Sequence, residues 1–167
     1  MSELEPGAPY VEVDAKRSFD DVPVEIDWHD YLARLRRPGS AVSVNDAIRP
    51  IRAQATGLQY RCSVAGVTSR RATAQIVWPA AAGATLADGS VTWVAEAMTT
   101  ASLRTTITSE DWPTVVGLTL SGEVNADLRY VVNVAGGVDG QTYLVKHQVT
   151  LLNGEDKEAV AVLPVRD

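Results

Sequence analysis

Apolar and polar positions alternate along much of the chain, and this pattern predicts strands. The longest alternating stretch covers residues 143–151, where one face would carry Tyr143, Val145, His147, Val149 and Leu151. A period of two residues is typical of a strand that buries one side. Residues 60–64 and 91–93 alternate in the same way, and residues 129–134 form a run rich in β-branched side chains. The pattern therefore predicts an all-β fold.

Turn residues separate these strands and predict how two of them pair. Asn153-Gly154 indicates a β-hairpin with a type I′ turn, because both residues tolerate the positive φ angles that this turn requires. The hairpin would join residues 143–151 to a second strand at 159–165. Pro164 indicates an edge or the end of that strand, since proline cannot donate a hydrogen bond to a neighbouring strand.

Only one segment has the features of a helix. Asp27 could cap a short helix over residues 28–35, with Asp30 near its start and basic residues near its end. Pro38-Gly39 would stop it. The alternative is an extended loop made of the same residues.

Length and composition favour a folded protein that stays in solution. The chain has 167 residues, of which 46% are hydrophobic and 22% charged, enough for one domain or for two small β modules. No apolar stretch reaches the roughly 18–20 residues of a membrane helix. The acidic N-terminus lacks the basic and apolar regions of a signal peptide. We expect a product of the cytoplasm without membrane insertion.

Charge changes sign twice along the chain. Residues 1–46 carry a net charge of −5, residues 47–87 carry +5, and residues 88–167 carry −6. The overall charge of −6 argues against nucleic-acid binding, which depends on neutralising phosphates. The central stretch has no acid and indicates a module boundary. Its arginines are Arg49, Arg52, Arg61, Arg70 and Arg71. They predict an electrostatic protein interface. The alternative is that they form a solvated face of a β module.

Residues that could support catalysis are few. The histidines are His29 and His147, and the only cysteine is Cys62. His147 and Cys62 both fall on apolar faces of predicted strands, which favours packed side chains over a nucleophile and its base. Adjacent acids point to opposite faces of a strand and do not form a shared site. We therefore predict no catalytic residues, no metal and no cofactor.

Two sets of motifs resemble bacteriophage proteins. Residues 58–94 combine a Tyr-bearing strand, a Gly-x-Thr turn, Trp-Pro and Asp-Gly-x-Val-x-Trp, and are similar to a module of phage tail and fibre proteins. The flanking Asp27-Trp28 start, the Ala135-Gly-Gly-x-x-Gly-x-x-Tyr143 segment and the Asn153-Gly154 hairpin resemble phage fibre-tail adaptor proteins.

The resemblance implies an immunoglobulin-like β-sandwich with a small inserted β module and one short helix. Residues 1–19 would form an N-terminal arm, residues 20–40 plus 98–167 the sandwich, and residues 41–97 the insertion. Candidate core and turn residues are Trp28, Trp78, Trp93, Trp112, Gly136, Gly137, Gly140, Tyr143, Asn153 and Gly154.

The resemblance also implies a function. The chain would be a structural component of the virion tail that attaches tail fibres or tailspikes, with other copies of itself and a tail tube, nozzle or portal-adaptor ring as partners. An alternative from another class is a carbohydrate-binding sandwich, in which exposed Trp78, Trp93 or Trp112 would stack on sugar rings.

Overall fold

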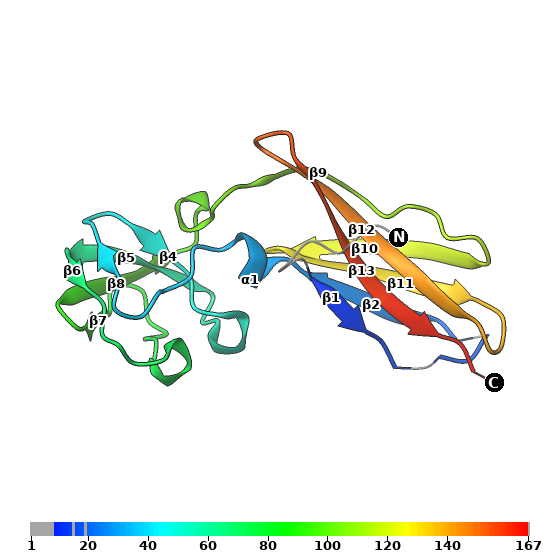
Figure 1. Ribbon diagram of the computed structural model, residues 1–167, viewed down its shortest axis with the longest axis horizontal. Coiled ribbons are helices and arrows are strands. Elements are labelled where there is room, and N and C mark those ends of the chain that lie inside the picture. Colours follow the sequence, from blue (N-terminus) through cyan, green and yellow to red (C-terminus); the bar gives the residue numbers. More distant parts are fainter. Residues whose placement is uncertain (1–8, 15, 19, 167) are drawn as a thin grey trace. The chain divides into compact units, whose positions relative to one another are not determined.

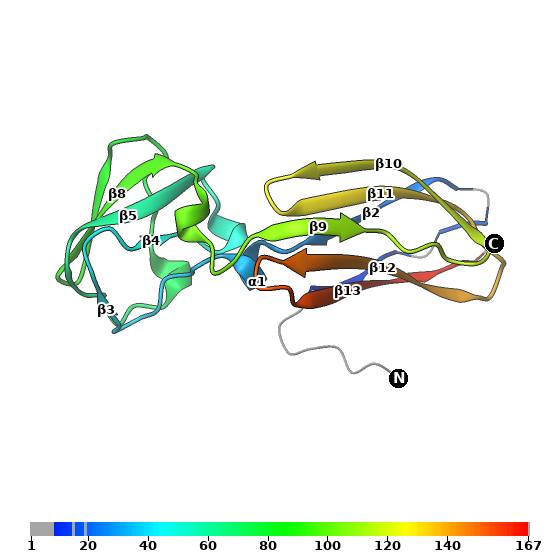
Figure 2. The same ribbon diagram turned by 90° about the horizontal axis from the view of Figure 1, so that it is seen from above.

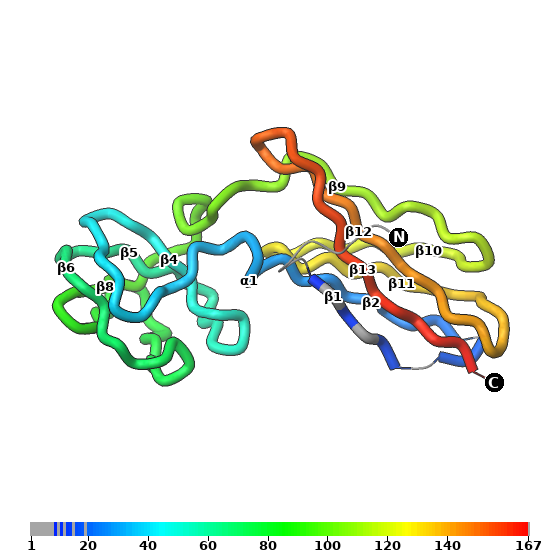
Figure 3. Tube along the Cα trace, in the orientation of Figure 1, coloured from blue at the N-terminus to red at the C-terminus, as the bar shows by residue number. Residues whose placement is uncertain are grey.

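In the computed structural model, which describes residues 9–14, 16–18 and 20–166, the chain divides into two compact units. The first unit consists of Met1–Tyr31 and Ile107–Asp167, and the second of Leu32–Thr106. Figure 3 traces the chain out of the first unit in blue and back into it in green. Strands account for 51% of the described residues and helices for 8%, which confirms the all-β prediction.

Two sheets make up the described part of the first unit. One has the strand order β1-β13-β12-β9, with β1 parallel to β13, and the other has the order β10-β11-β2. The strands are β1 (Tyr10–Glu12), β2 (Val22–Asp27), β9 (Ile107–Asp111), β10 (Leu118–Ala126), β11 (Arg129–Gly136), β12 (Thr142–Leu151) and β13 (Asp156–Pro164). Figure 2 shows β10 and β11 side by side, and Figure 1 shows β12 and β13 crossing the other sheet.

The inner faces of these two sheets share one core. In β12 the burial alternates as the sequence predicts, with Val145, His147, Val149 and Leu151 buried. Across the core, the ring centroids of Tyr130 on β11 and His147 on β12 lie 4.4 Å apart. The period-two pattern therefore has a direct physical cause, because one side of each sheet packs against the other sheet.

The hairpin predicted at Asn153-Gly154 forms, but its turn is not of type I′. Only Gly154 has a positive φ (82°), and Gly154 N–H donates to the carbonyl of Leu151 at 2.8 Å. Leu151 N–H in turn donates to the carbonyl of Glu155 at 2.8 Å, which closes a three-residue loop. Such a loop needs one left-handed residue rather than two. The second strand consequently starts at Asp156, three residues before the predicted position.

The second unit is built on a sheet with the strand order β4-β5-β8-β7, and β3 pairs with β6. Its elements are β3 (Ala41–Val42), β4 (Ala47–Ile48), η1 (Arg52–Gln54), β5 (Leu58–Val64), β6 (Gly66–Val67), η2 (Thr73–Gln75), β7 (Thr85–Asp88), β8 (Val91–Ala97) and η3 (Thr100–Ser102). Tyr60, Cys62 and Trp93 belong to its core. Val64, predicted on the same face, is 52% exposed, because the register shifts after Cys62.

The predicted helix over 28–35 is shorter in the structure. Helix α1 covers His29–Leu32, and Asp27 caps it by accepting a hydrogen bond from His29 N–H at 2.8 Å. Beyond it, Ala33 forms a β-bridge with Leu103. Bonds to neighbouring extended chain thus replace the helical bonds that residues 33–35 would have made.

The unit boundaries fall outside the inserted module predicted from the sequence. The units divide at 31/32 and 106/107, whereas the resemblance implies boundaries at 40/41 and 97/98 and the charge changes sign at 46/47 and 87/88. Segments 32–40 and 98–106 join through hydrogen bonds, such as Arg34 N–H to the carbonyl of Ser102 at 2.8 Å. In the predicted N-terminal arm, residues 1–8, 15 and 19 lie outside the described residues, and Tyr10–Glu12 pair with β13.

Candidate interaction surface

A buried ion pair organises the second unit. Arg36, in the extended segment after α1, donates from Nε to Asp88 Oδ2 at 2.6 Å and from Nη2 to Asp88 Oδ1 at 2.8 Å. Both side chains are fully buried. Asp88 also accepts hydrogen bonds from Ser69 N–H and Oγ at 3.0 and 2.7 Å and from Trp93 Nε1 at 3.3 Å. The carboxylate is therefore satisfied on both oxygens.

These donors decide the ionisation of Asp88. Burial by itself would raise the pKa of the carboxyl group, but the hydrogen bonds from Arg36, Ser69 and Trp93 outweigh burial and lower the pKa to about 2. The pair is thus charged at neutral pH and ties the Arg36 segment to the end of β7. The alternation of apolar and polar residues does not indicate this ion pair, because Asp88-Gly89 is recognisable in the sequence only as a turn.

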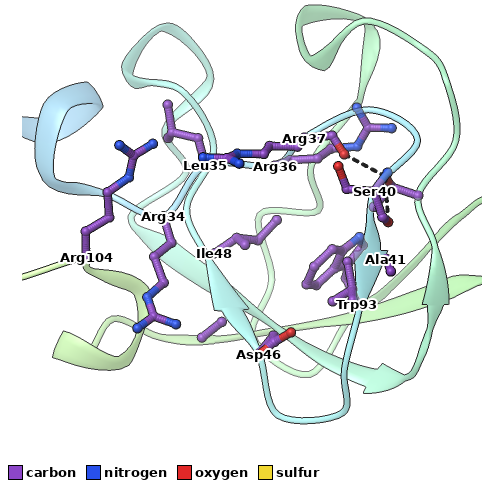
Figure 4. Close-up of a pocket in the computed structure, with 13 residues that line it drawn as sticks. Arg34, Leu35, Arg36, Arg37, Ser40, Ala41, Asp46, Ile48, Trp93 and Arg104 are labelled. Carbon is purple, nitrogen blue, oxygen red and sulfur yellow. Dashed lines mark hydrogen bonds between the residues drawn. The ribbon is translucent and has the colours of Figure 1, made fainter. Parts of the chain in front are cut away.

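Beside this pair lies a pocket of about 590 Å³, lined by residues of the second unit. Its lining includes the exposed arginines Arg34, Arg37 and Arg104, one exposed carboxylate, Asp46, and the buried side chains of Ile48 and Trp93. Figure 4 shows Arg34 and Arg104 together at one side, with Arg37 apart from them. We call this the arginine-rimmed pocket.

The second unit is basic as a whole. Between Leu32 and Thr106 the sequence has nine arginines and three acids, a net charge of +6. Two of those acids are already in ion pairs, Asp88 with Arg36 and Glu96 with Arg61 at 2.9 Å. The rest of the chain has six bases and eighteen acids, a net charge of −12. The charge difference between the units is larger than the sequence segments 1–46, 47–87 and 88–167 indicate.

The five arginines predicted as an interface do not form one surface. Arg49 is only 4% exposed and donates from Nε to Ser102 Oγ at 2.9 Å, so it is a buried structural residue, contrary to the prediction. Arg52 and Arg61 are half-buried, and Arg70 and Arg71 are exposed. Arg34, Arg37 and Arg104 were missed because two of them fall in the segment assigned to a helix end and one lies alone in an acidic region.

All four tryptophans are buried. Trp28 and Trp93 have no exposed surface, and Trp78 and Trp112 are each 6% exposed. Trp78 packs on Tyr60 with ring centroids 4.5 Å apart. These side chains belong to the cores, and none presents the face that stacking on a sugar ring requires.

The glycine-rich turn before β12 needs its glycines. Gly136, Gly137 and Gly140 have φ angles of 85°, 105° and 76°. A Cβ atom on Gly137 would lie 2.8 Å from Cγ2 of Val165. The Tyr143 hydroxyl accepts a hydrogen bond from Val138 N–H at 3.1 Å and thereby closes the turn. Asn153 and Gly154 occupy the other end of β12, in the hairpin loop.

His147 is held as a neutral core residue. Its Nδ1 accepts from Trp28 Nε1 at 2.9 Å, so Nε2 carries the proton and donates to Glu110 Oε2 at 2.9 Å. Burial lowers the pKa of His147 and outweighs the opposing effect of Glu110. Cys62 is also buried, and burial raises the pKa of its thiol. Both residues have the environment of packed side chains.

No group of three or more His, Cys, Asp or Glu side chains in the described ranges is arranged to hold a metal ion. None of the helices in the same ranges has the length and apolar character needed to cross a membrane.

Comparison of the chain with known protein families, with curated proteins and with solved structures gives no match.

Proposed function

We propose that the protein is a non-catalytic structural component of a bacteriophage tail, which attaches tail fibres or tailspikes to the tail. In this proposal the first unit is an immunoglobulin-like sandwich and the second unit is inserted between two of its strands. The strand order of the first unit is the observation that supports the sandwich, and the resemblance of residues 135–143 and of the Asn153-Gly154 hairpin to fibre-tail adaptor proteins supports the tail function.

That order supports an immunoglobulin-like assignment, because in the constant-type arrangement strands A, B, E and D form one sheet and C, F and G the other. If β2 is strand B, then β9 to β13 follow as C, D, E, F and G. The sheets then contain D-E-B and G-F-C, as in the strand orders β10-β11-β2 and β13-β12-β9. Strand β1 would then be strand A, which pairs in parallel with β13 (strand G) and not with the sheet of strands B, E and D.

The turn before β12 supports the same assignment. Immunoglobulin-like domains have a tyrosine near the start of strand F whose hydroxyl bonds to the backbone a few residues upstream. Tyr143 is the second residue of β12 and accepts from Val138 N–H, five residues upstream. This corner lies in the segment whose glycines and tyrosine resemble fibre-tail adaptor proteins, so the resemblance and the geometry agree there.

Mass spectrometry of purified virions from a phage that encodes this chain tests the proposal. We expect the protein in the particles at a fixed multiple of the portal protein. Virions made without the gene should lack fibres, and addition of the purified protein together with fibres should restore them. The absence of the chain from virions, or normal fibres without it, would refute the proposed function.

A further inference from the structure

The first unit carries an acidic surface on the sheet that contains β9, β12 and β13. Asp111 on β9 and Asp156 on β13 are exposed and line a hollow of about 460 Å³. Asp111 is opposite Gln148 and Asp156 opposite Thr150, two residues apart on β12, so both aspartates point outward on the same face. Among the described residues, neither aspartate forms an ion pair.

An exposed leucine lies in the loop that precedes Asp156. Leu152, in the loop between β12 and β13, is 71% exposed, and Glu155 follows it in the same turn. We call Asp111, Leu152, Glu155 and Asp156 the acidic hairpin surface. An exposed apolar side chain next to carboxylates in the chain is the chemical counterpart of a pocket that carries guanidinium groups and an apolar side chain such as Ile48.

The arginine-rimmed pocket offers that counterpart. Arg34, Arg37 and Arg104 form no ion pair with any carboxylate in the described ranges, although their side chains are exposed. Their charge adds to that of a unit with a net charge of +6, whereas the first unit has −12. Net charges of opposite sign and this size produce electric fields that steer association and determine which surfaces meet.

We propose that the arginine-rimmed pocket of one copy binds the acidic hairpin surface of a second copy. Asp111 and Asp156 pair with the rim arginines, and Leu152 enters the apolar interior beside Ile48. The two surfaces differ, so the contact is heterologous and each bound copy still offers one free surface. Repetition gives a closed ring or an open chain of copies. The inference goes beyond the proposed function and does not depend on a phage context.

Purified full-length protein and two charge-reversed variants test the contact by sedimentation velocity. One variant combines Arg37→Glu with Arg104→Glu, and the other combines Asp111→Lys with Asp156→Lys. The wild type should associate at about 0.01 M salt and dissociate at about 1 M salt, where the Debye length falls from about 30 Å to about 3 Å. Each variant alone should associate at least about tenfold more weakly.

Mixing the variants provides the decisive measurement. Arg37→Glu/Arg104→Glu keeps the acidic hairpin surface but has an acidic pocket, and Asp111→Lys/Asp156→Lys keeps the pocket but has a basic hairpin. Their mixture has one intact contact and one contact whose charges are exchanged, so it should recover association to within about tenfold of the wild type. The chain that carries all four changes should recover it as well.

Matched controls separate this contact from general charge effects. Arg70→Glu with Arg71→Glu changes the charge of the second unit by the same amount, at residues that do not line the pocket. Asp21→Lys with Glu123→Lys does the same for the first unit, at residues outside the acidic hairpin surface. Both should associate like the wild type. Leu152→Ser should weaken association without changing its salt dependence. Near-ultraviolet circular dichroism verifies the fold of each variant.

Three results would overturn the proposal. The first is a wild-type protein that stays monomeric at all concentrations at low salt. The second is an equal loss of association in the Arg37→Glu/Arg104→Glu variant and in its Arg70→Glu/Arg71→Glu control. The third is a mixture of the two charge-reversed variants that does not recover association. None of these results bears on whether the chain occurs in virions, which remains the test of the proposed function.

Discussion

Replacement of Asp88 by asparagine should destabilise the second unit more than any other single change of an acid to its amide there. The variant keeps the shape of the side chain and removes its charge. The guanidinium of Arg36 then remains fully buried without a counter-charge. Breaking a buried pair by removing one partner costs about 3–5 kcal/mol of unfolding free energy.

The depressed pKa of Asp88 indicates a stabilisation of the same order of magnitude. A shift from 3.8 to about 2 corresponds to about 2–3 kcal/mol, at 1.36 kcal/mol per pKa unit. Because the folded-state pKa is depressed, this stability is present above about pH 4 and disappears as the pH falls toward 2. The asparagine variant should lack this part of the acid dependence.

Hydrogen exchange in increasing urea, read by mass spectrometry on peptides from residues 32–106, measures the loss within the second unit alone. For a unit of this size, about 3–5 kcal/mol lowers the melting temperature by roughly 10–40 °C. Glu96→Gln is the matched control. Its partner Arg61 is 38% exposed, and such pairs contribute about 0–1 kcal/mol. Equal losses in the two variants, or a loss below about 1 kcal/mol at Asp88, would refute the reasoning.

Three further predictions concern the first unit. Burial depresses the pKa of His147 below that of the unfolded chain, so the unit should lose stability as the pH falls below about 6.5. His147→Gln should abolish this loss in unfolding experiments between pH 7 and 5.5. An unchanged dependence of unfolding free energy on pH in the variant would contradict the prediction. Tyr143→Phe should cost about 1 kcal/mol in urea unfolding, because Val138 N–H loses its acceptor, whereas no change would mean that water replaces the hydroxyl. Gly137→Ala should cost more, about 1–3 kcal/mol in the same assay, because its φ is 105° and the new methyl would press on Val165; a stable alanine variant would show that the turn relaxes.

The sequence alone determined the strands that bury one face. The alternation from Tyr143 to Leu151 predicts both β12 and its buried side, because a strand between a core and solvent must place apolar residues at every second position. The Asn153-Gly154 pair predicts the hairpin for a local reason, since glycine alone adopts positive φ without strain. Where local signals were incomplete, as in the turn type and in the helix that ends at Leu32, the prediction failed in detail.

Only the tertiary structure decided which charged residues face solvent. Arg36 and Arg49 are buried and Arg37 and Arg104 are exposed, although nothing in their sequence neighbourhoods separates them. Arg36 is buried because Asp88, 52 residues further along the chain, compensates its charge. A contact between residues this far apart leaves neither a periodic pattern nor a local motif in the sequence. The sequence therefore indicates that the centre of the chain is basic, and the fold determines which of its arginines can meet a partner.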